Sequence, residues 1–322
     1  MKKNNTGIFV GILLIVITLV SFSSTFFIYK KGINRQNMQN QGTESQDTIK
    51  VVTSFYPMYI ATLNIVDGAE NVSVTNLTST DVGCLHDYQI TTQDMIKLSD
   101  ADVLVINGGG MENFIDKALS TYTELKIINA SQNIKENHEN EYKESHDEHH
   151  DHGENSHYWV SISLYIEQVK NIKDELCRID VKNAFLYEMN ANNYISKLEE
   201  LKTKMHNSLD NIDNKNIVTF HEAFDYFAEE FDLDIVAVIE REPGTYPSSR
   251  DVAEIIDEIK DKNVNAIFVE PQYSRTAADT IARETHVNVY ELDPIVTGEL
   301  NKDAYINTMN KNLDVLENAF KG

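Results

Sequence analysis

The sequence predicts an α/β fold with two lobes, each a mostly parallel sheet flanked by helices, joined by one long rigid helix. Three observations favour this fold. The chain has 322 residues, about twice the length of a typical single domain. From residue 49 onward, short β-branched runs alternate with longer stretches of helical periodicity, a pattern typical of parallel sheets covered by helices. Between two such series, residues 182–210 contain neither proline nor glycine, so a helix there would be about 40 Å long.

The first alternating series predicts an N-terminal lobe over residues 49–181. Its β-branched runs are short and are separated by amphipathic stretches, as expected for strands and helices in turn. The expected strands are 49–54, 72–77, 103–107 and 125–129. The expected helices are 57–67, 92–99, 111–121 and 160–178.

The second alternating series follows the long helix at 182–210 and predicts a C-terminal lobe over residues 211–322. Its expected strands are 216–220, 234–240, 265–269 and 287–292. Its expected helices are 222–231, 250–262, 274–285 and 302–319. The two series are similar in size, so we expect two lobes of the same class.

The N-terminus, residues 1–31, reads as a membrane anchor or signal segment. Lys2 and Lys3 precede an apolar run over residues 8–29, which at about 22 residues is long enough to span a bilayer. Ser21 could belong to a signal-peptide cleavage site, but the run continues past it, which favours an uncleaved anchor. Residues 32–48 are rich in polar residues and predict a flexible tether.

The charge and the cysteine content limit the possible partners. A net charge of -23, with no stripe of basic residues to offset it, argues against nucleic acid as a partner. The excess of carboxylates fits a protein that lives among cations, and fits simple solubility equally well. Cys84 and Cys177 are the only cysteines, which leaves open one disulfide bridge or two buried thiols.

Four residues at expected strand ends and loop tips are candidate metal ligands. His86 lies in a loop after the second strand, and His157 closes an acidic loop at 133–156. His221 directly follows a strand and is expected to open a helix, whereas Asp293 follows the last strand. Ligands of open α/β sheets bind at these strand ends. Because two candidates come from each lobe, they could meet only in the cleft between the lobes.

The acidic loop carries further histidines among its carboxylates. Flexible tracts of this composition bind Zn²⁺ weakly and reversibly, because their ligands must be ordered at each binding event. A solvated linker with incidental histidines is the alternative. The histidines expected to bind metal weakly are His138, His146, His149, His150 and His152.

The donor types of the four candidates indicate which metal would bind. Three imidazoles and one carboxylate suit four-coordinate Zn²⁺, whereas Mn²⁺ prefers more oxygen donors. Glu270 could support the site by accepting an imidazole N–H. It could equally pair with Arg275 or cap a helix.

Several blocks of residues 49–322 resemble the zinc and manganese receptors of ABC importers, the helical-backbone branch of the solute-binding proteins. The blocks are GCLHDYQITTQDMIKLSDADVLVINGGGMENFIDK, HYWVS, VTFHEAFDYFAEEFDLDIVAVI, IFVEPQYS and ELDPI. The resemblance implies one metal buried between two lobes. The family's ligand positions fall on His86, His157, His221 and Asp293. One departure is Leu85, where the family commonly has proline, which bears on the stiffness of the loop.

The resemblance implies an extracytoplasmic, high-affinity zinc receptor that delivers Zn²⁺ to an ABC permease in the cytoplasmic membrane. A monomer is expected. The alternative is a manganese receptor of the same family. In manganese members of the family the third ligand position resembles a glutamate, whereas this chain has His221 there. Together with the His-rich loop, this favours zinc.

Two other classes of function, an enzyme and a surface adhesin, fit the sequence less well than the receptor. His221 and Glu222 begin a motif like the H-E-x-x-H of zinc proteases, but the fifth residue is Asp225, so the second imidazole is missing. Four protein ligands would also close the coordination position that catalysis needs. We therefore expect no enzyme activity. A surface adhesin would need no such set of strand-end histidines.

Overall fold

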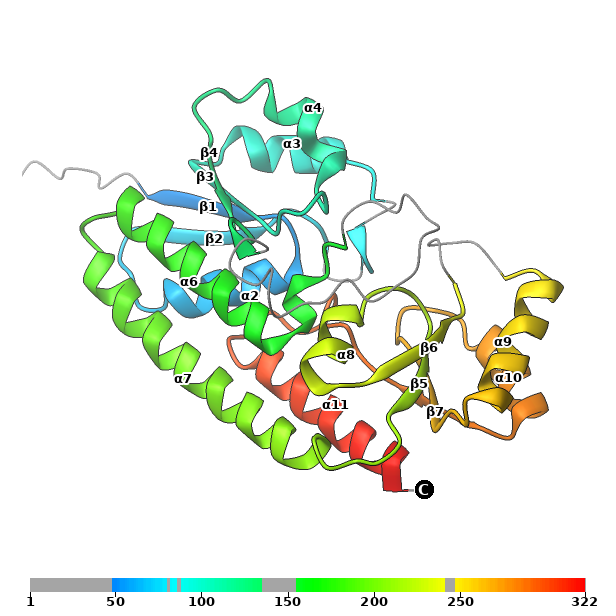
Figure 1. Cartoon of the computed structure of the whole chain (residues 1–322). Helices are drawn as coiled ribbons and strands as arrows, with labels where there is room; N and C mark the ends of the chain where they lie inside the picture. Colours follow the sequence, from blue (N-terminus) through cyan, green and yellow to red (C-terminus); the bar gives the residue numbers. More distant parts are fainter. Residues whose placement is uncertain (1–47, 80–81, 86–87, 135–154, 241–246, 322) are drawn as a thin grey trace, which may run out of the picture. The chain divides into compact units, whose positions relative to one another are not determined.

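A computed structural model describes residues 48–79, 82–85, 88–134, 155–240 and 247–321 (Figure 1). The expected anchor or signal segment at 1–31 lies outside the described residues, as does nearly all of the tether. No helix in the described part of the chain is long and apolar enough to cross a membrane. Residues 49–322 form one compact unit.

The N-terminal lobe is built on a four-stranded parallel sheet with strand order β2-β1-β3-β4. The strands are β1 (Ile49–Thr53), β2 (Val72–Asn76), β3 (Val103–Ile106) and β4 (Lys126–Asn129). The helices are α2 (Tyr56–Ile65), α3 (Thr92–Ser99), the 3₁₀ turn η2 (Asn113–Ile115) and α4 (Asp116–Leu119). Local sequence features determine where two of these helices begin. Thr91 and Asp94 form a capping box at the N-terminus of α3, and a proline lies in the first turn of α2.

The C-terminal lobe repeats this design with a parallel sheet of order β6-β5-β7-β8. The strands are β5 (Asn216–Thr219), β6 (Asp234–Val238), β7 (Ala266–Val269) and β8 (Asn288–Glu291). The helices are α8 (Asp225–Phe231), α9 (Ser249–Asp261), α10 (Thr276–Thr285) and α11 (Ala304–Lys321). The fold class predicted from the sequence is therefore confirmed.

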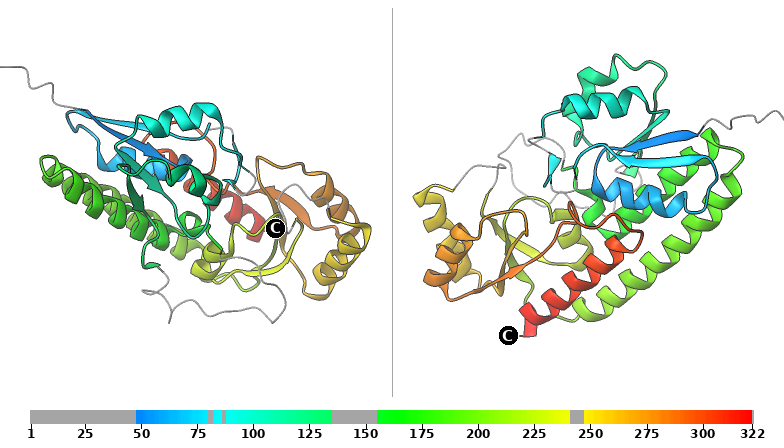
Figure 2. Two further views of the ribbon diagram at one scale, coloured as in Figure 1. Left: turned by 90° about the horizontal axis from the view of Figure 1, so that it is seen from above. Right: turned by 180° about the vertical axis from the view of Figure 1, so that it is seen from behind.

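Two long helices lie between the sheets in sequence, α6 (Ile162–Ile179) and α7 (Ala184–Leu209), preceded by the 3₁₀ turn η3 (Tyr158–Val160). The helix α7 has 26 residues and is about 39 Å long. Figures 1 and 2 show it running beneath both lobes, with α6 and α11 alongside. One apolar core joins Val51 of β1, Leu198 of α7 and Leu313 of α11. The lobes thus share a core in addition to the connecting helix.

The structure corrects the prediction that His221 opens a helix. The helix α8 begins only at Asp225, and residues 221–224 form a turn. The N–H of Ala223 donates to the carbonyl oxygen of His221 at 2.9 Å, and this bond over two residues diverts the chain from a helical path. Asp225, rather than Glu222, supplies the acidic residue of the first helical turn.

Candidate metal centre

The side chain of His157 is fixed by Asn155. The amide oxygen Oδ1 of Asn155 accepts from the backbone N–H of His157 at 3.0 Å and from its Nδ1–H at 2.8 Å. The amide Nδ2 of Asn155 donates to the carbonyl oxygen of Glu222 and to the carboxylate of Asp225, which sets the orientation of the amide. The Nδ1 atom of His157 therefore carries the proton, and its Nε2, which faces the Cys84 sulfur, is the nitrogen that would coordinate a metal.

Asn155 also connects the two lobes next to the candidate ligands. Its partners Glu222 and Asp225 belong to the turn after β5 and to the first turn of α8. The hydroxyl of Tyr226 in the same helix donates to the carbonyl oxygen of Asn155 at 3.0 Å. These bonds hold the segment that carries His157 against the segment that carries His221.

His221 is buried next to a carboxylate. It follows β5, and its Nδ1 donates to an oxygen of Glu270, which follows β7. Both residues are almost fully buried. Burial lowers the pKa of His221, but the adjacent Glu270 carboxylate and the nearby Cys84 outweigh this effect and raise the pKa to about 10. The Nε2 atom of His221 is buried and has no hydrogen-bond partner among the described residues. A buried nitrogen of this kind, on a ring whose other nitrogen is held by a carboxylate, is typical of a metal-binding imidazole.

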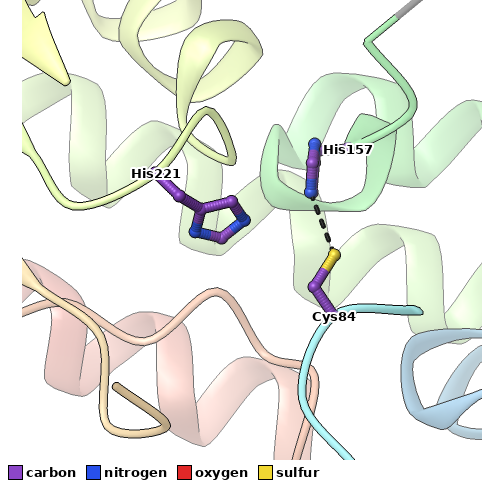
Figure 3. Close-up of side chains that lie close together, drawn as sticks. All are labelled: Cys84, His157 and His221. Carbon is purple, nitrogen blue, oxygen red and sulfur yellow. Dashed lines mark hydrogen bonds between the residues drawn. The ribbon is translucent and has the colours of Figure 1, made fainter. Parts of the chain in front are cut away.

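His157 and His221 approach each other together with Cys84. Their ring centroids are 5.3 Å apart. One ligand atom from each of Cys84, His157 and His221 lies within 4.8 Å of the other two. Figure 3 shows the sulfur and both rings converging from three separate segments of the chain. Nitrogen and sulfur donors at these separations can bind a single metal ion.

Asp293 lies after β8, outside this group of three. Its Oδ1 accepts from the N–H of Ile295 at 2.7 Å, and its backbone N–H donates to Oδ1 of Asn312 at 3.0 Å. Burial raises the pKa of the Asp293 carboxyl, and the N–H of Ile295 opposes that rise. The charge of Asp293 also acts on Glu270, so Asp293 faces the same region.

His86 lies outside the described residues, as do the five histidines of the acidic loop. Of the four candidate ligands, the structure thus brings His157 and His221 together and places Asp293 at a neighbouring turn.

Two residues of this centre were missed in the sequence. Cys84, expected from the sequence to be a disulfide partner or a buried thiol, stands two positions before His86 in a Cys-x-His spacing that could have indicated a metal donor. Asn155 likewise stands two positions before His157, but an asparagine in a polar loop carries no signal of its own. Cys84 and Cys177 form no disulfide in the structure, so the possible bridge is not made.

Comparison with known proteins decides the family. The model of the zinc-uptake complex component A, a periplasmic family called ZnuA, matches residues 51–319. The chain belongs to the ZnuA family. This confirms the resemblance drawn from the sequence blocks, and with it the family of zinc-uptake binding proteins.

Members of the ZnuA family and related structures are similar over most of the chain. The high-affinity zinc uptake protein ZnuA of Bacillus subtilis is 31% identical over 303 residues, which cover 91% of this chain and 94% of that protein. The zinc-binding protein AdcA of Streptococcus pyogenes is 29% identical over 94% of this chain, which spans only 60% of AdcA. The solute-binding protein FpvC of Pseudomonas aeruginosa, solved with Mn²⁺, has a TM-score of 0.72 and 28% identity, with 85% of this chain and 98% of FpvC covered.

Proposed function

We propose that this chain is an extracytoplasmic, high-affinity zinc receptor that delivers Zn²⁺ to the permease of an ABC importer. The observation that carries the proposal is the convergence of His157 and His221, two imidazoles 64 positions apart in the sequence, with buried nitrogens directed at one point. His86 and Asp293 are the remaining candidate donors of the set. Membership of the ZnuA family supports zinc as the transported ion.

Zinc capture would exchange the water shell of the ion for protein donors. Neutral imidazoles and an ionised carboxylate satisfy a dehydrated Zn²⁺, which takes four ligands in closed sites. The imidazoles are oriented in advance, since Asn155 accepts from Nδ1 of His157 and Glu270 accepts from Nδ1 of His221. Such outer partners fix the ring and raise the basicity of the coordinating nitrogen. They also lower the entropic cost of assembling the site.

The binding role is favoured over catalysis. The similar proteins are named for zinc uptake and zinc binding, and a closed four-ligand site leaves no position for an activated water. The H-E-x-x-H pattern also fails in three dimensions, because His221 lies in a turn before α8 and not on the helix. We infer that the chain has no enzyme activity.

Delivery places the folded part of the chain outside the cytoplasmic membrane as a monomer held by its N-terminal segment. The shared core of α7, α11 and β1 favours a small adjustment between lobes over wide hinge closure. Release of zinc to the permease then requires displacement of a ligand-bearing segment. Turns such as residues 221–224 are the segments that can shift without breaking a helix or a sheet.

Metal titration of the full chain in detergent tests the proposal. The protein, stripped of metal with a chelator, should bind one Zn²⁺ tightly and prefer it to Mn²⁺ in direct competition. His221→Ala should abolish tight binding, because it removes one of the two convergent imidazoles. His206→Ala is the matched control, since His206 is a partly exposed histidine of α7 outside the site. Preference for Mn²⁺, or tight zinc binding by His221→Ala, would overturn the proposal.

A further inference from the structure

Cys84 belongs to the group of three candidate donors with His157 and His221, and Asp293 does not. Its Sγ atom is 3.2 Å from Nε2 of His157. Two donors bound to the same tetrahedral zinc, one at a Zn–N distance of about 2.05 Å and one at a Zn–S distance of about 2.3 Å, lie about 3.6 Å apart. The sulfur and the imidazole therefore already stand near the separation of two ligands of one zinc ion.

A second, independent feature points to a metal at this position. The Nε2 atom of His221 is buried and lacks a hydrogen-bond partner among the described residues, and the residue is only 3% exposed. Its ring is directed toward Cys84 and His157 in Figure 3. A buried nitrogen without a partner costs free energy, and a metal ion shared with the sulfur and with His157 would satisfy it.

We propose that the Cys84 thiolate is a direct ligand of the bound zinc, together with His157 and His221. The inference rests on the zinc-receptor function proposed above and changes only the set of donors. A closed zinc site takes four ligands, so the sulfur and the two imidazoles leave one position for a further donor. When the zinc–sulfur bond forms, the thiol proton is released to solvent, since only the thiolate coordinates.

A thiolate in this position would determine metal specificity. Soft sulfur donors select zinc and other soft or borderline ions, whereas Mn²⁺ prefers carboxylate, carbonyl and water oxygens. The imidazoles of the site already favour Zn²⁺ over Mn²⁺, and a Cys84 thiolate would increase this preference. The carboxylate of Asp293 lies outside the group of three and adds negative charge near the site whether or not it coordinates.

The experiment is cobalt substitution of the full chain in detergent, under a non-thiol reductant. Thiolate ligands give Co²⁺ a charge-transfer band in the near ultraviolet, which nitrogen and oxygen donors do not give. We expect this band in the wild type and in Cys177→Ser, and its loss in Cys84→Ser. Cys177 is the matched control, because its sulfur lies on α6 and contacts the carbonyl oxygen of Ala184 instead of the centre.

Two further measurements separate the possible failures. X-ray absorption of the zinc-loaded wild type should show one sulfur scatterer at about 2.3 Å, and Cys84→Ser should lower zinc affinity about tenfold or more while lowering Mn²⁺ affinity less. Stoichiometric tight zinc binding without a sulfur scatterer and without the cobalt band would overturn the role of Cys84 alone. Failure of the wild type to bind zinc tightly would overturn the zinc-receptor function, and the ligand proposal with it.

Discussion

The indole Nε1–H of Trp159 donates a hydrogen bond to the carbonyl oxygen of Pro294 across 2.7 Å. Trp159 is fully buried and packs edge-on against Phe55, with ring centroids 4.8 Å apart. The bond joins the turn that follows His157 to the turn that contains Asp293. This buried hydrogen bond therefore fixes the position of His157 relative to Asp293, although neither Trp159 nor Pro294 is a candidate metal donor.

Replacing Trp159 with Phe should weaken both the fold and the metal site. The change leaves the Pro294 carbonyl oxygen without its buried donor, which costs about 1–3 kcal/mol, and it loosens the turn next to His157. We expect a lower urea midpoint for the metal-free protein and a lower zinc affinity by titration. Tyr187→Phe is the control, because it removes a buried hydroxyl bond to Asp180 away from the centre. Equal loss of zinc affinity in both variants would show that Trp159 acts only through stability.

The two partners of the imidazoles should tune affinity without binding metal. Glu270→Ala and Asn155→Ala each remove the acceptor of an Nδ1–H, so each should reduce zinc affinity about 10- to 100-fold. Glu270→Gln keeps an acceptor and loses the charge, and should have the smaller effect. Calorimetric titration of the three variants checks the order. Unchanged affinity in Glu270→Ala would show that the ring of His221 is held by packing alone.

Much of the fold was predictable because its signals are local. Alternating β-branched and helical runs, and caps such as the Thr91–Asp94 capping box, depend on residues that are close in the sequence. The strand ends that carry His221 and Asp293 could be predicted from these runs. The pairings inside the centre were not predictable, because His221 and Glu270 are 49 positions apart and Cys84 and His157 are 73 apart. Only the packing of the two sheets brings such residues together, and the spacing of residues in the sequence does not predict that packing.

Zinc binding should weaken as pH falls toward about 6, because protons compete for the imidazoles. The Glu270 carboxylate raises the pKa of His221 above its ordinary value, so zinc should displace a proton from His221 even at pH 8. Titrations in buffers of different ionisation enthalpy measure the protons released. In Glu270→Gln, proton release at pH 8 should decrease. Binding that is independent of pH between 6 and 8 would contradict this account.

The same shift predicts the pH dependence of stability for the metal-free protein. A histidine whose pKa is raised by folding contributes stability at pH values below its unfolded pKa of about 6.5. That contribution is lost as pH rises through the folded value of about 10. The unfolding free energy should therefore fall between about pH 7 and 10 in the wild type, and less steeply in Glu270→Gln. An identical slope in both proteins would mean that the His221–Glu270 pair is not the source.

Deletion of residues 138–152 should separate weak from tight zinc binding. The deleted segment holds the five loop histidines among many carboxylates, a composition that binds zinc weakly. The tight site depends on donors outside the segment, such as His157 and His221. Zinc titration of the deletion variant should thus lose its weak phase and keep one tightly bound equivalent. Replacing the five histidines with serine should give the same result at unchanged loop length. If either change removed the tight equivalent, loop histidines would have to be counted among the ligands of the buried ion.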